Sequence, residues 1–166
     1  MPRLVVISNR VAIPDENGPA PGGLAVAVEA AMRNREGIWF GWSGEKAEEP
    51  GPLTVVQRDN LQYILTDLHP QDFDEYYNGF ANRVLWPILH YRVDLAEFNE
   101  AEFGGYQRVN EFFAERLSPL LEEDDVLWVH DYHLIPLASA LRQRGHGNRI
   151  GFFLHIPMPP ADLITA

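Results

Sequence analysis

Short apolar runs alternate with helix-forming segments along this chain, and this alternation is what most restricts its fold. Residues 4–8 (LVVIS), 38–42 (IWFGW) and 126–130 (VLWVH) are apolar at successive positions, as in parallel strands buried on both faces. Residues 149–157 (RIGFFLHIP) form another such run. Strands that alternate with helices indicate an α/β domain. We therefore predict a Rossmann-like, mainly parallel sheet with helices on both faces.

The segments between these runs carry helix signals. Residues 24–35 are rich in alanine and end in basic residues, which suit a helix C-terminus, and Gly37 is a plausible stop. Residues 106–120 repeat apolar side chains at spacings of three and four, which predicts an amphipathic helix. A further helix is predicted over residues 134–145, with Gly145 as its stop.

Two segments predict other local structures. Residues 53–65 indicate two strands joined at Asp59 and Asn60, as in a hairpin. From residue 69 onward the pattern becomes helical, and Pro70 suits the first helical turn. Pro87, after Trp86, predicts a break or kink in that helix.

Composition and charge exclude several classes of function. A chain of 166 residues with 46% hydrophobic and 22% charged residues can form one folded domain. It has no cysteine, so disulfides and thiolate metal sites are excluded. The net charge of -11 disfavours nucleic acid and anionic membrane as partners, although a few arginines could still bind a small anion. No apolar run approaches membrane-spanning length, and we expect a cytoplasmic protein.

Polar side chains follow several of the predicted strands. Asn9 and Arg10 come after residues 4–8, Asp131 follows His130, and His155 interrupts the last apolar run. Ligands of open α/β sheets bind at the carboxyl ends of the strands. We therefore expect these side chains to meet at one edge of the sheet and to form a binding site there.

Several of these residues also have ordinary structural explanations. Gly22 and Gly23 could hold a phosphate at a helix N-terminus, or they could form a turn. Arg10 could bind a phosphate or lie in solvent on a loop, and His155 could be a hydrogen-bonded core histidine. The sequence contains neither the GxGxxG dinucleotide fingerprint nor a Walker lysine.

The cluster HDYH offers His130 and His133 three positions apart, but no further ligands at a recognisable spacing. We therefore predict no metal site. A serine nucleophile is also not indicated, because there is no nucleophile elbow, and Asp131 is better suited to accept hydrogen bonds from hydroxyls or to act as a base. The aromatic residues Tyr77 and Trp86 could belong to the core or could form a platform for a sugar ring.

Seven stretches between residues 3 and 160 resemble, in collinear order, the N-terminal domain of the trehalose-6-phosphate synthases. These are retaining glucosyltransferases with the two-domain GT-B fold. The stretches are LVVISNR, GGLAVAV, WFGWSGE, DEYYNGFANRVLWPILHYR, YQRVNEFFAERL, VLWVHDYHLIPLASALRQRG and RIGFFLHIPMP.

This resemblance implies transfer of glucose from UDP-glucose to glucose 6-phosphate, giving trehalose 6-phosphate and UDP with retention at the anomeric carbon. It assigns Arg10 to the acceptor phosphate, Tyr77 and Trp86 to the acceptor pocket, and Asp131 to the acceptor hydroxyls. In reactions of this type the leaving diphosphate takes the proton of the incoming hydroxyl, so no separate protein base is implied.

The same resemblance also implies which residues contact the glucose donor, UDP-glucose. Gly22 and Gly23 would contact the donor, and His155 would face the donor sugar, so that Asp131 and His155 are the residues expected at the reacting groups. No role is carried over to His130 or His133. The resemblance implies neither a metal nor another cofactor, and it leaves a homo-oligomer of the full-length enzyme open.

Residues 1–166 would then form a single, truncated N-terminal acceptor-binding domain. The family's second domain, which carries an arginine–lysine pair for the diphosphate, is not expected in this chain. Two alternatives stay open. One is a related glycosyltransferase with another acceptor or nucleotide donor, and the other is a non-catalytic sugar-phosphate-binding domain.

Overall fold

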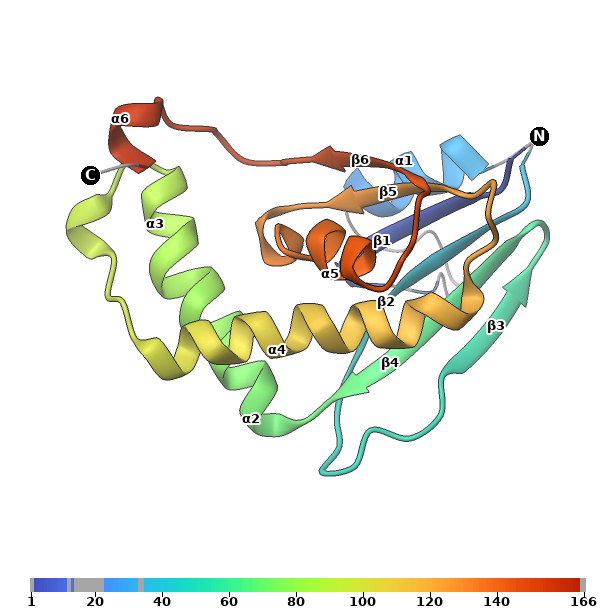
Figure 1. Cartoon of the computed structure of the whole chain (residues 1–166), viewed down its shortest axis with the longest axis horizontal. Helices are drawn as coiled ribbons and strands as arrows, with labels where there is room; N and C mark the ends of the chain where they lie inside the picture. Colours follow the sequence, from blue (N-terminus) through green and yellow to red (C-terminus); the bar gives the residue numbers. More distant parts are fainter. Residues whose placement is uncertain (1, 12, 14–22, 33–34, 165–166) are drawn as a thin grey trace.

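The computed structural model describes residues 2–11, 13, 23–32 and 35–164 (Figure 1). Six strands form one sheet in the order β3-β4-β2-β1-β5-β6. All neighbouring pairs are parallel except β3 and β4, which form the antiparallel hairpin expected at Asp59 and Asn60. The strands are β1 (Leu4–Arg10), β2 (Gly37–Lys46), β3 (Thr54–Arg58), β4 (Leu61–Leu68), β5 (Val126–His130) and β6 (Arg149–Phe153).

Helices connect these strands and cover both faces of the sheet. The longer ones are α1 (Gly23–Met32), the π-helix η1 (Asp74–Leu85), α4 (Glu100–Leu117) and α5 (Leu137–Gln143). Short helices and 3-10 turns complete the set: α2 (Pro70–Phe73), α3 (Trp86–Leu89), η2 (Val93–Leu95), η3 (Ser118–Leu120), η4 (Tyr132–Leu134) and α6 (Ala161–Ile164). In Figure 1, α4 and α5 lie on one face of the sheet and α1 on the other. The α/β prediction is confirmed.

The alternation of side chains along the strands builds one core on each face. Val5 and Ile7 of β1 belong to the core beneath η1, α4 and α5, whereas Val6 between them belongs to the core beneath α1. In β2, Phe40 belongs to the core beneath η1, α4 and α5, and its neighbour Trp39 belongs to the core beneath α1. Because neighbouring residues of a strand point to opposite faces, the apolar runs of β1 and β2 are buried on both sides of the sheet. The run in β6 differs, because β6 is an edge strand and its Phe152 and Phe153 are exposed.

Several predicted boundaries need correction. Gly37 does not end a helix but begins β2, where an added Cβ would lie 2.4 Å from the carbonyl oxygen of Leu4. The run predicted as a strand over 149–157 is paired only as far as Phe153. The amphipathic helix begins at Glu100 because the side chain of Asn99 caps it, accepting from the backbone N–H of Ala101.

The predicted kink at Pro87 is also wrong. Trp86 before it is helical, and the residue with non-helical backbone angles is Gly79. Proline removes the N–H that would bond to the carbonyl four residues back. That carbonyl, on Arg83, instead accepts from the N–H of Glu97 at 3.2 Å, so the missing bond is replaced and the helix continues.

Gly145 ends α5 as predicted. Its φ of +88° lies in the left-handed region that glycine adopts without a Cβ penalty. The N–H of His146 bonds to the carbonyl of Leu141, and that of Gly145 to Arg142, at 3.1 and 3.0 Å. This pair of bonds is the Schellman arrangement that closes a helix C-terminus.

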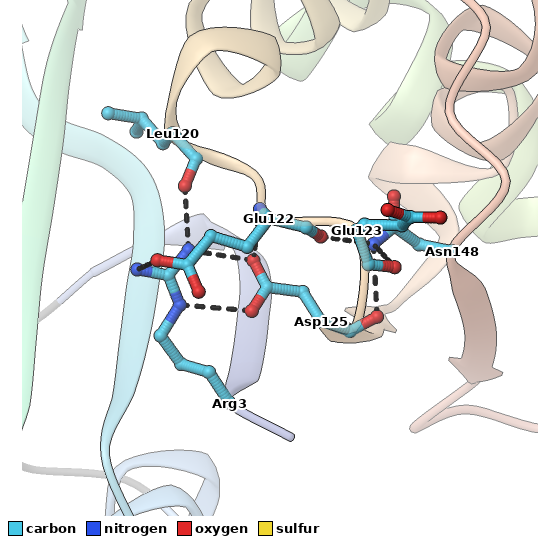
Figure 2. A network of polar contacts seen from close by, with 6 residues as sticks. All are labelled: Arg3, Leu120, Glu122, Glu123, Asp125 and Asn148. Carbon is cyan, nitrogen blue, oxygen red and sulfur yellow. Dashed lines mark hydrogen bonds and ion pairs between the residues drawn. The ribbon is translucent and has the colours of Figure 1, made fainter.

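A polar network joins the amino ends of β1 and β5 (Figure 2). Arg3 donates to both carboxylate oxygens of Asp125, at 3.0 and 2.7 Å, and to the carbonyl of Leu120. Asn148 bonds to three carbonyls of the same turn, including that of Asp125. Asp125 is only 2% exposed, so this two-point ion pair compensates a charge that would otherwise be costly to bury.

No helix in the described ranges is long and apolar enough to cross a membrane.

Candidate functional site

The carboxyl ends of the strands bring the predicted polar residues to one edge of the sheet. Arg10 is the last residue of β1, Asp131 follows β5 directly, and His155 lies two residues beyond β6. Since β1, β5 and β6 are neighbouring parallel strands, their ends lie side by side. Sequence reasoning thus located this edge correctly, although Arg10 belongs to the strand itself rather than to a following loop.

Arg10 presents a positive charge at this edge. Its side chain is exposed, and its guanidinium carbon lies 5.8 Å from the ring centroid of Trp42. In the described part of the chain, none of the ion pairs involves Arg10. Gly44, at φ +98°, makes room for it, since a Cβ there would lie 2.8 Å from Nη2 of Arg10. The guanidinium is therefore positioned by an aromatic ring and remains available to an anion.

Aromatic rings continue from Trp42 toward Asp131, and we call this row the aromatic wall. Its members are Trp42, Phe73, Tyr77, His133 and Tyr132. Tyr77 is half-buried and is stacked on Phe73 and on His133, with ring centroids 5.3 and 5.5 Å apart. Trp42, Tyr132 and His133 are buried, whereas Phe73 and Tyr77 are partly exposed and are the rings of the wall that a ligand could reach.

Trp86 is separate from this row. Its indole is 43% exposed and is stacked on His90, with centroids 4.0 Å apart. The core explanation is therefore wrong for Trp86. Among the described ring contacts none joins Trp86 to Tyr77, so its place in an acceptor pocket stays a prediction.

Asp131 has an unusual backbone conformation, with φ 75° and ψ 167°. A positive φ strains a residue with a Cβ, and such strain is common at functional sites. Oδ1 accepts from the N–H of Tyr132 at 3.0 Å and from the N–H of His155 at 3.4 Å. No described residue hydrogen-bonds to Oδ2, which leaves this oxygen free to accept from a ligand hydroxyl.

The three histidines of this edge have different environments. His155 is exposed, which contradicts the core explanation for it, and its Nε2 lies 2.9 Å from Nδ1 of buried His130. His133 is also buried, and neither of its ring nitrogens has a described hydrogen-bond partner. Burial lowers the pKa of His133 to about 4, and burial together with the nearby His155 lowers that of His130 to about 4. Both buried imidazoles are therefore neutral at pH 7.

The neutral state of His133 has a measurable effect on stability. In the unfolded chain its pKa returns to about 6.5, so the unfolded state binds a proton that the folded state excludes. We expect the free energy of unfolding to fall as the pH drops from 6.5 to 4, by up to ~1.4 kcal/mol per pH unit from this group. His133→Phe keeps a ring in the wall and should remove this contribution.

Urea unfolding of the wild type and of His133→Phe at pH 7 and pH 5 measures the difference. At pH 7 the two should be similar in stability, because no described hydrogen bond is lost from the side chain. At pH 5 the variant should be the more stable. Equal dependence on pH in both proteins would show that His133 titrates normally in the folded state.

The glycine pair is described only in part. Gly22 lies outside the described residues, and Gly23 is the first residue of α1. At the other end of α1, Met32 packs so close to Gly37 that a Cβ there would lie 1.9 Å from its Cε. Since Gly37 begins β2, the N-terminus of α1 points toward the carboxyl ends of the strands. This arrangement fits an anion at the helix N-terminus, although the donor contact stays a prediction.

Three further residues contribute to this edge. Asn9 was expected there from the sequence, whereas Trp42 and His133 had been given no role. Trp42 supports Arg10, His133 supports Tyr77, and Asn9 accepts a hydrogen bond of 2.8 Å from the hydroxyl of buried Tyr76. One signal was available for Trp42. It is the last residue of the apolar run 38–42, and so lies at the carboxyl end of a predicted strand, as Arg10 does. The structure shows that the two residues are register partners across β1 and β2.

A hollow of about 830 Å³ lies at the opposite end of the sheet, beside the network of Figure 2. Its lining includes Glu36, Glu122, Glu123 and Asp124. Such a lining repels anionic ligands. The candidate site is therefore the edge at the carboxyl ends of the strands, where Arg10 has no carboxylate partner among the described residues. Among the described residues, no group of three or more His, Asp or Glu side chains is arranged to hold a metal ion.

Comparison with known proteins identifies relatives of this chain over nearly its whole length. A trehalose-6-phosphate synthase of Sinorhizobium fredii is 61% identical over 168 residues, which is 99% of this chain and 36% of that protein. The Escherichia coli trehalose-6-phosphate structure bound with UDP-2-fluoro glucose superposes with a TM-score of 0.92 at 51% identity, covering 99% of this chain and 35% of that one. The chain thus spans about a third of the length of these relatives.

A second similar solved structure holds a sugar phosphate rather than a nucleotide sugar. It is an α,α-trehalose-phosphate synthase (UDP-forming) from Burkholderia xenovorans in complex with glucose-6-phosphate. It matches with a TM-score of 0.88 at 48% identity, over 98% of this chain and 35% of that one. The family model for glycosyltransferase family 20 matches residues 6–166. On this evidence the chain belongs to glycosyltransferase family 20.

Proposed function

We propose that this chain is the N-terminal, acceptor-binding part of a retaining glucosyltransferase. The reaction moves glucose from UDP-glucose to glucose 6-phosphate and gives trehalose 6-phosphate and UDP. The observation that carries the proposal is the row formed by Arg10, the aromatic wall and Asp131. Among the described residues, the guanidinium of Arg10 has no ion-pair partner and Oδ2 of Asp131 has no hydrogen-bond donor.

That row offers one partner for each part of a hexose phosphate. A phosphate dianion pairs with Arg10, the sugar ring packs on the wall beside Tyr77, and ring hydroxyls donate to Asp131. The Burkholderia xenovorans relative in complex with glucose-6-phosphate supports this acceptor. The Escherichia coli relative bound with UDP-2-fluoro glucose supports the donor, for which His155 and the N-terminus of α1 are the available groups here.

The chemistry proposed for these residues is mainly positioning. The acceptor hydroxyl must approach the anomeric carbon on the face from which the diphosphate leaves, and that diphosphate takes its proton. Arg10 and Asp131 would hold the acceptor at two points and fix its orientation, which converts binding into rate. A residue acting as a separate base is not required, in agreement with the low pKa of His130 and His133, about 4 for each, which makes both imidazoles weak proton acceptors.

Asp131→Asn should lower kcat/KM for glucose 6-phosphate in a full-length enzyme that carries this segment. The side chain keeps its size but loses the charge, and hydrogen bonds to a charged group contribute ~1.5–3 kcal/mol, or roughly 10- to 150-fold. Asparagine tolerates a positive φ as well as aspartate does, so the backbone should be unaffected.

Asp124→Asn is a matched control, because Asp124 is exposed and lies at the opposite end of the same strand. Steady-state kinetics and thermal melting of both variants separate a change in the site from a change in the fold. Unchanged kinetics in Asp131→Asn would remove Asp131 from the site.

A direct binding experiment tests the proposal against the two alternatives. Calorimetry with glucose 6-phosphate, glucose and several nucleotide sugars should show binding of the phosphorylated hexose and preference for the uridine nucleotide. Preference for another acceptor or nucleobase would favour a related glycosyltransferase. Binding of glucose 6-phosphate without any turnover in the full-length protein would favour a non-catalytic sensor.

Three further features belong to the proposal. We expect no metal requirement, a cytoplasmic location, and possible assembly of the full-length enzyme into a homo-oligomer. Activity assays with a chelator, cell fractionation and analytical ultracentrifugation would measure these in turn.

A further inference from the structure

Two histidines from adjacent strands face each other at the edge of the sheet. His130 is the last residue of β5, and His155 follows β6, its parallel neighbour. Nδ1 of His130 lies 2.9 Å from Nε2 of His155, and the ring planes are 26° apart with centroids separated by 5.1 Å. His130 is 1% exposed and His155 is exposed, so the pair links the interior to the surface of the site.

The hydrogen bond between these rings requires one donor and one acceptor. The burial of His130 determines which of the two rings donates. A neutral imidazole has a single N–H. Burial and the neighbouring His155 keep the pKa of His130 low, at about 4, so near neutral pH its ring has one proton to place. That proton lies either on Nδ1, which faces His155, or on Nε2.

Nε2 of His130 is buried and has no hydrogen-bond partner among the described residues. A proton on Nε2 would therefore be a buried donor without an acceptor, which is rare in folded proteins. A proton on Nδ1 instead donates to His155 and leaves only a lone pair unpaired. The second arrangement makes the hydrogen bond with the buried proton and is the favoured one.

The arrangement of His155 follows from this. If its Nε2 accepts from His130, its own proton lies on Nδ1, for which no described residue is a partner. The backbone of His155 is held as well, since its N–H points to Oδ1 of Asp131 at 3.4 Å. Ring and backbone are thus both fixed by neighbours at the end of β5.

We propose that His130 is a positioning residue that fixes His155 as the Nδ1–H tautomer, so that His155 presents a hydrogen-bond donor to an oxygen of the bound ligand. The identity of that ligand, a sugar hydroxyl or phosphate of the donor substrate, rests on the proposed function. The tautomer itself does not, because the contacts that set it lie within this chain. His130 acts only through His155 and is not assigned a contact with substrate.

The test is the tautomer of His155, measured without ligand. In protein labelled with ¹⁵N-histidine at pH 8, long-range ¹H–¹⁵N spectra distinguish a protonated ring nitrogen from an unprotonated one. In the wild type we expect protonated Nδ1 and unprotonated Nε2 for both His130 and His155. A protonated Nε2 on His155 would overturn the proposal, and this result is available even where a variant fails to fold.

Two variants separate positioning from a merely structural role. His130→Phe keeps a ring in the interior but has no N–H, so His155 should lose its single Nδ1–H tautomer and show a mixture. His130→Asn places an amide N–H near the former Nδ1 and should restore the Nδ1–H form. The proposal is supported if His155 loses its single tautomer in His130→Phe and regains it in His130→Asn. It is overturned if the tautomer of His155 is the same in His130→Phe as in the wild type.

His146→Phe is the matched control, since His146 bonds to Ser118 at 2.9 Å and belongs to the turn that closes α5. It removes an imidazole hydrogen bond elsewhere and should leave the His155 tautomer unchanged. Because no substrate is present, failure of the glucosyltransferase proposal would show in the binding and turnover experiments but not in these spectra.

Discussion

Residues 1–166 on their own are expected to make no measurable trehalose 6-phosphate from UDP-glucose and glucose 6-phosphate. The reaction requires stabilisation of the negative charge that develops on the leaving diphosphate. The sequence has no lysine or arginine between Arg10 and Arg33, the interval that contains the glycine pair assigned to the donor. Arg10 itself is assigned to the acceptor phosphate. Removal of a single stabilising donor commonly costs about 10²–10³ in rate, so loss of a whole clamp should exceed this.

Exposure of the donor side to water should lower the activity of the isolated chain further. The relatives are about three times as long as this chain, and we expect the rest of such a protein to form the opposite wall of the cleft. With the edge at Arg10, Asp131 and His155 open to water, the contacts to a donor are weakened. The acceptor residues should be less affected, since they come from elements of this domain.

The assay incubates purified 1–166 with both substrates and measures released UDP and trehalose 6-phosphate, with a full-length family enzyme as the positive control. Turnover near that of the full-length enzyme would contradict the assignment of the diphosphate clamp to the rest of the protein. It would also require that a second copy of this chain supply the opposite wall, which sedimentation of the active sample would detect.

Arg10→Ala is expected to weaken binding of glucose 6-phosphate by roughly 10- to 150-fold. A charge-assisted contact to phosphate contributes ~1.5–3 kcal/mol, and no described carboxylate competes for this guanidinium. Glucose lacks the phosphate and should bind equally to wild type and variant. The loss should therefore depend on the phosphate, which distinguishes a binding role from a structural one.

Calorimetry on a full-length enzyme that carries this segment measures both affinities. Arg58→Ala is the control, because it removes the same charge from the exposed strand β3, which pairs at the far edge of the sheet from β6. It should leave both affinities unchanged. Equal losses of glucose and glucose 6-phosphate in Arg10→Ala would mean that Arg10 supports the fold of the edge rather than the phosphate.

Local sequence rules were sufficient where the physical cause is also local. The stop at Gly145 was readable because its cause is local, a left-handed residue that only glycine adopts easily. The kink predicted at Pro87 failed because the carbonyl it left unpaired found a partner at Glu97, in the next segment. Proline acts locally, but whether a freed carbonyl bends the helix depends on what else can reach it.

The sequence by itself determined the α/β class and the edge at which the residues of the candidate site gather. Runs that are apolar at every position predict strands buried on both faces, which holds for β1 and β2 but not for the exposed edge strand β6. Polar residues that follow parallel strands then gather at one edge of the sheet. Motif resemblance added the family and the roles expected of Arg10, Asp131 and His155.

Only the tertiary structure decided the state of each side chain at that edge. The position of the Arg10 guanidinium depends on Trp42 across the β1–β2 pair, and the pairing of His130 with His155 depends on β5 lying beside β6. The neutrality of His133 depends on its burial against Tyr77. Burial and hydrogen bonding are set by residues distant in sequence, and they, rather than residue type, fix the charge and the proton positions that a ligand meets.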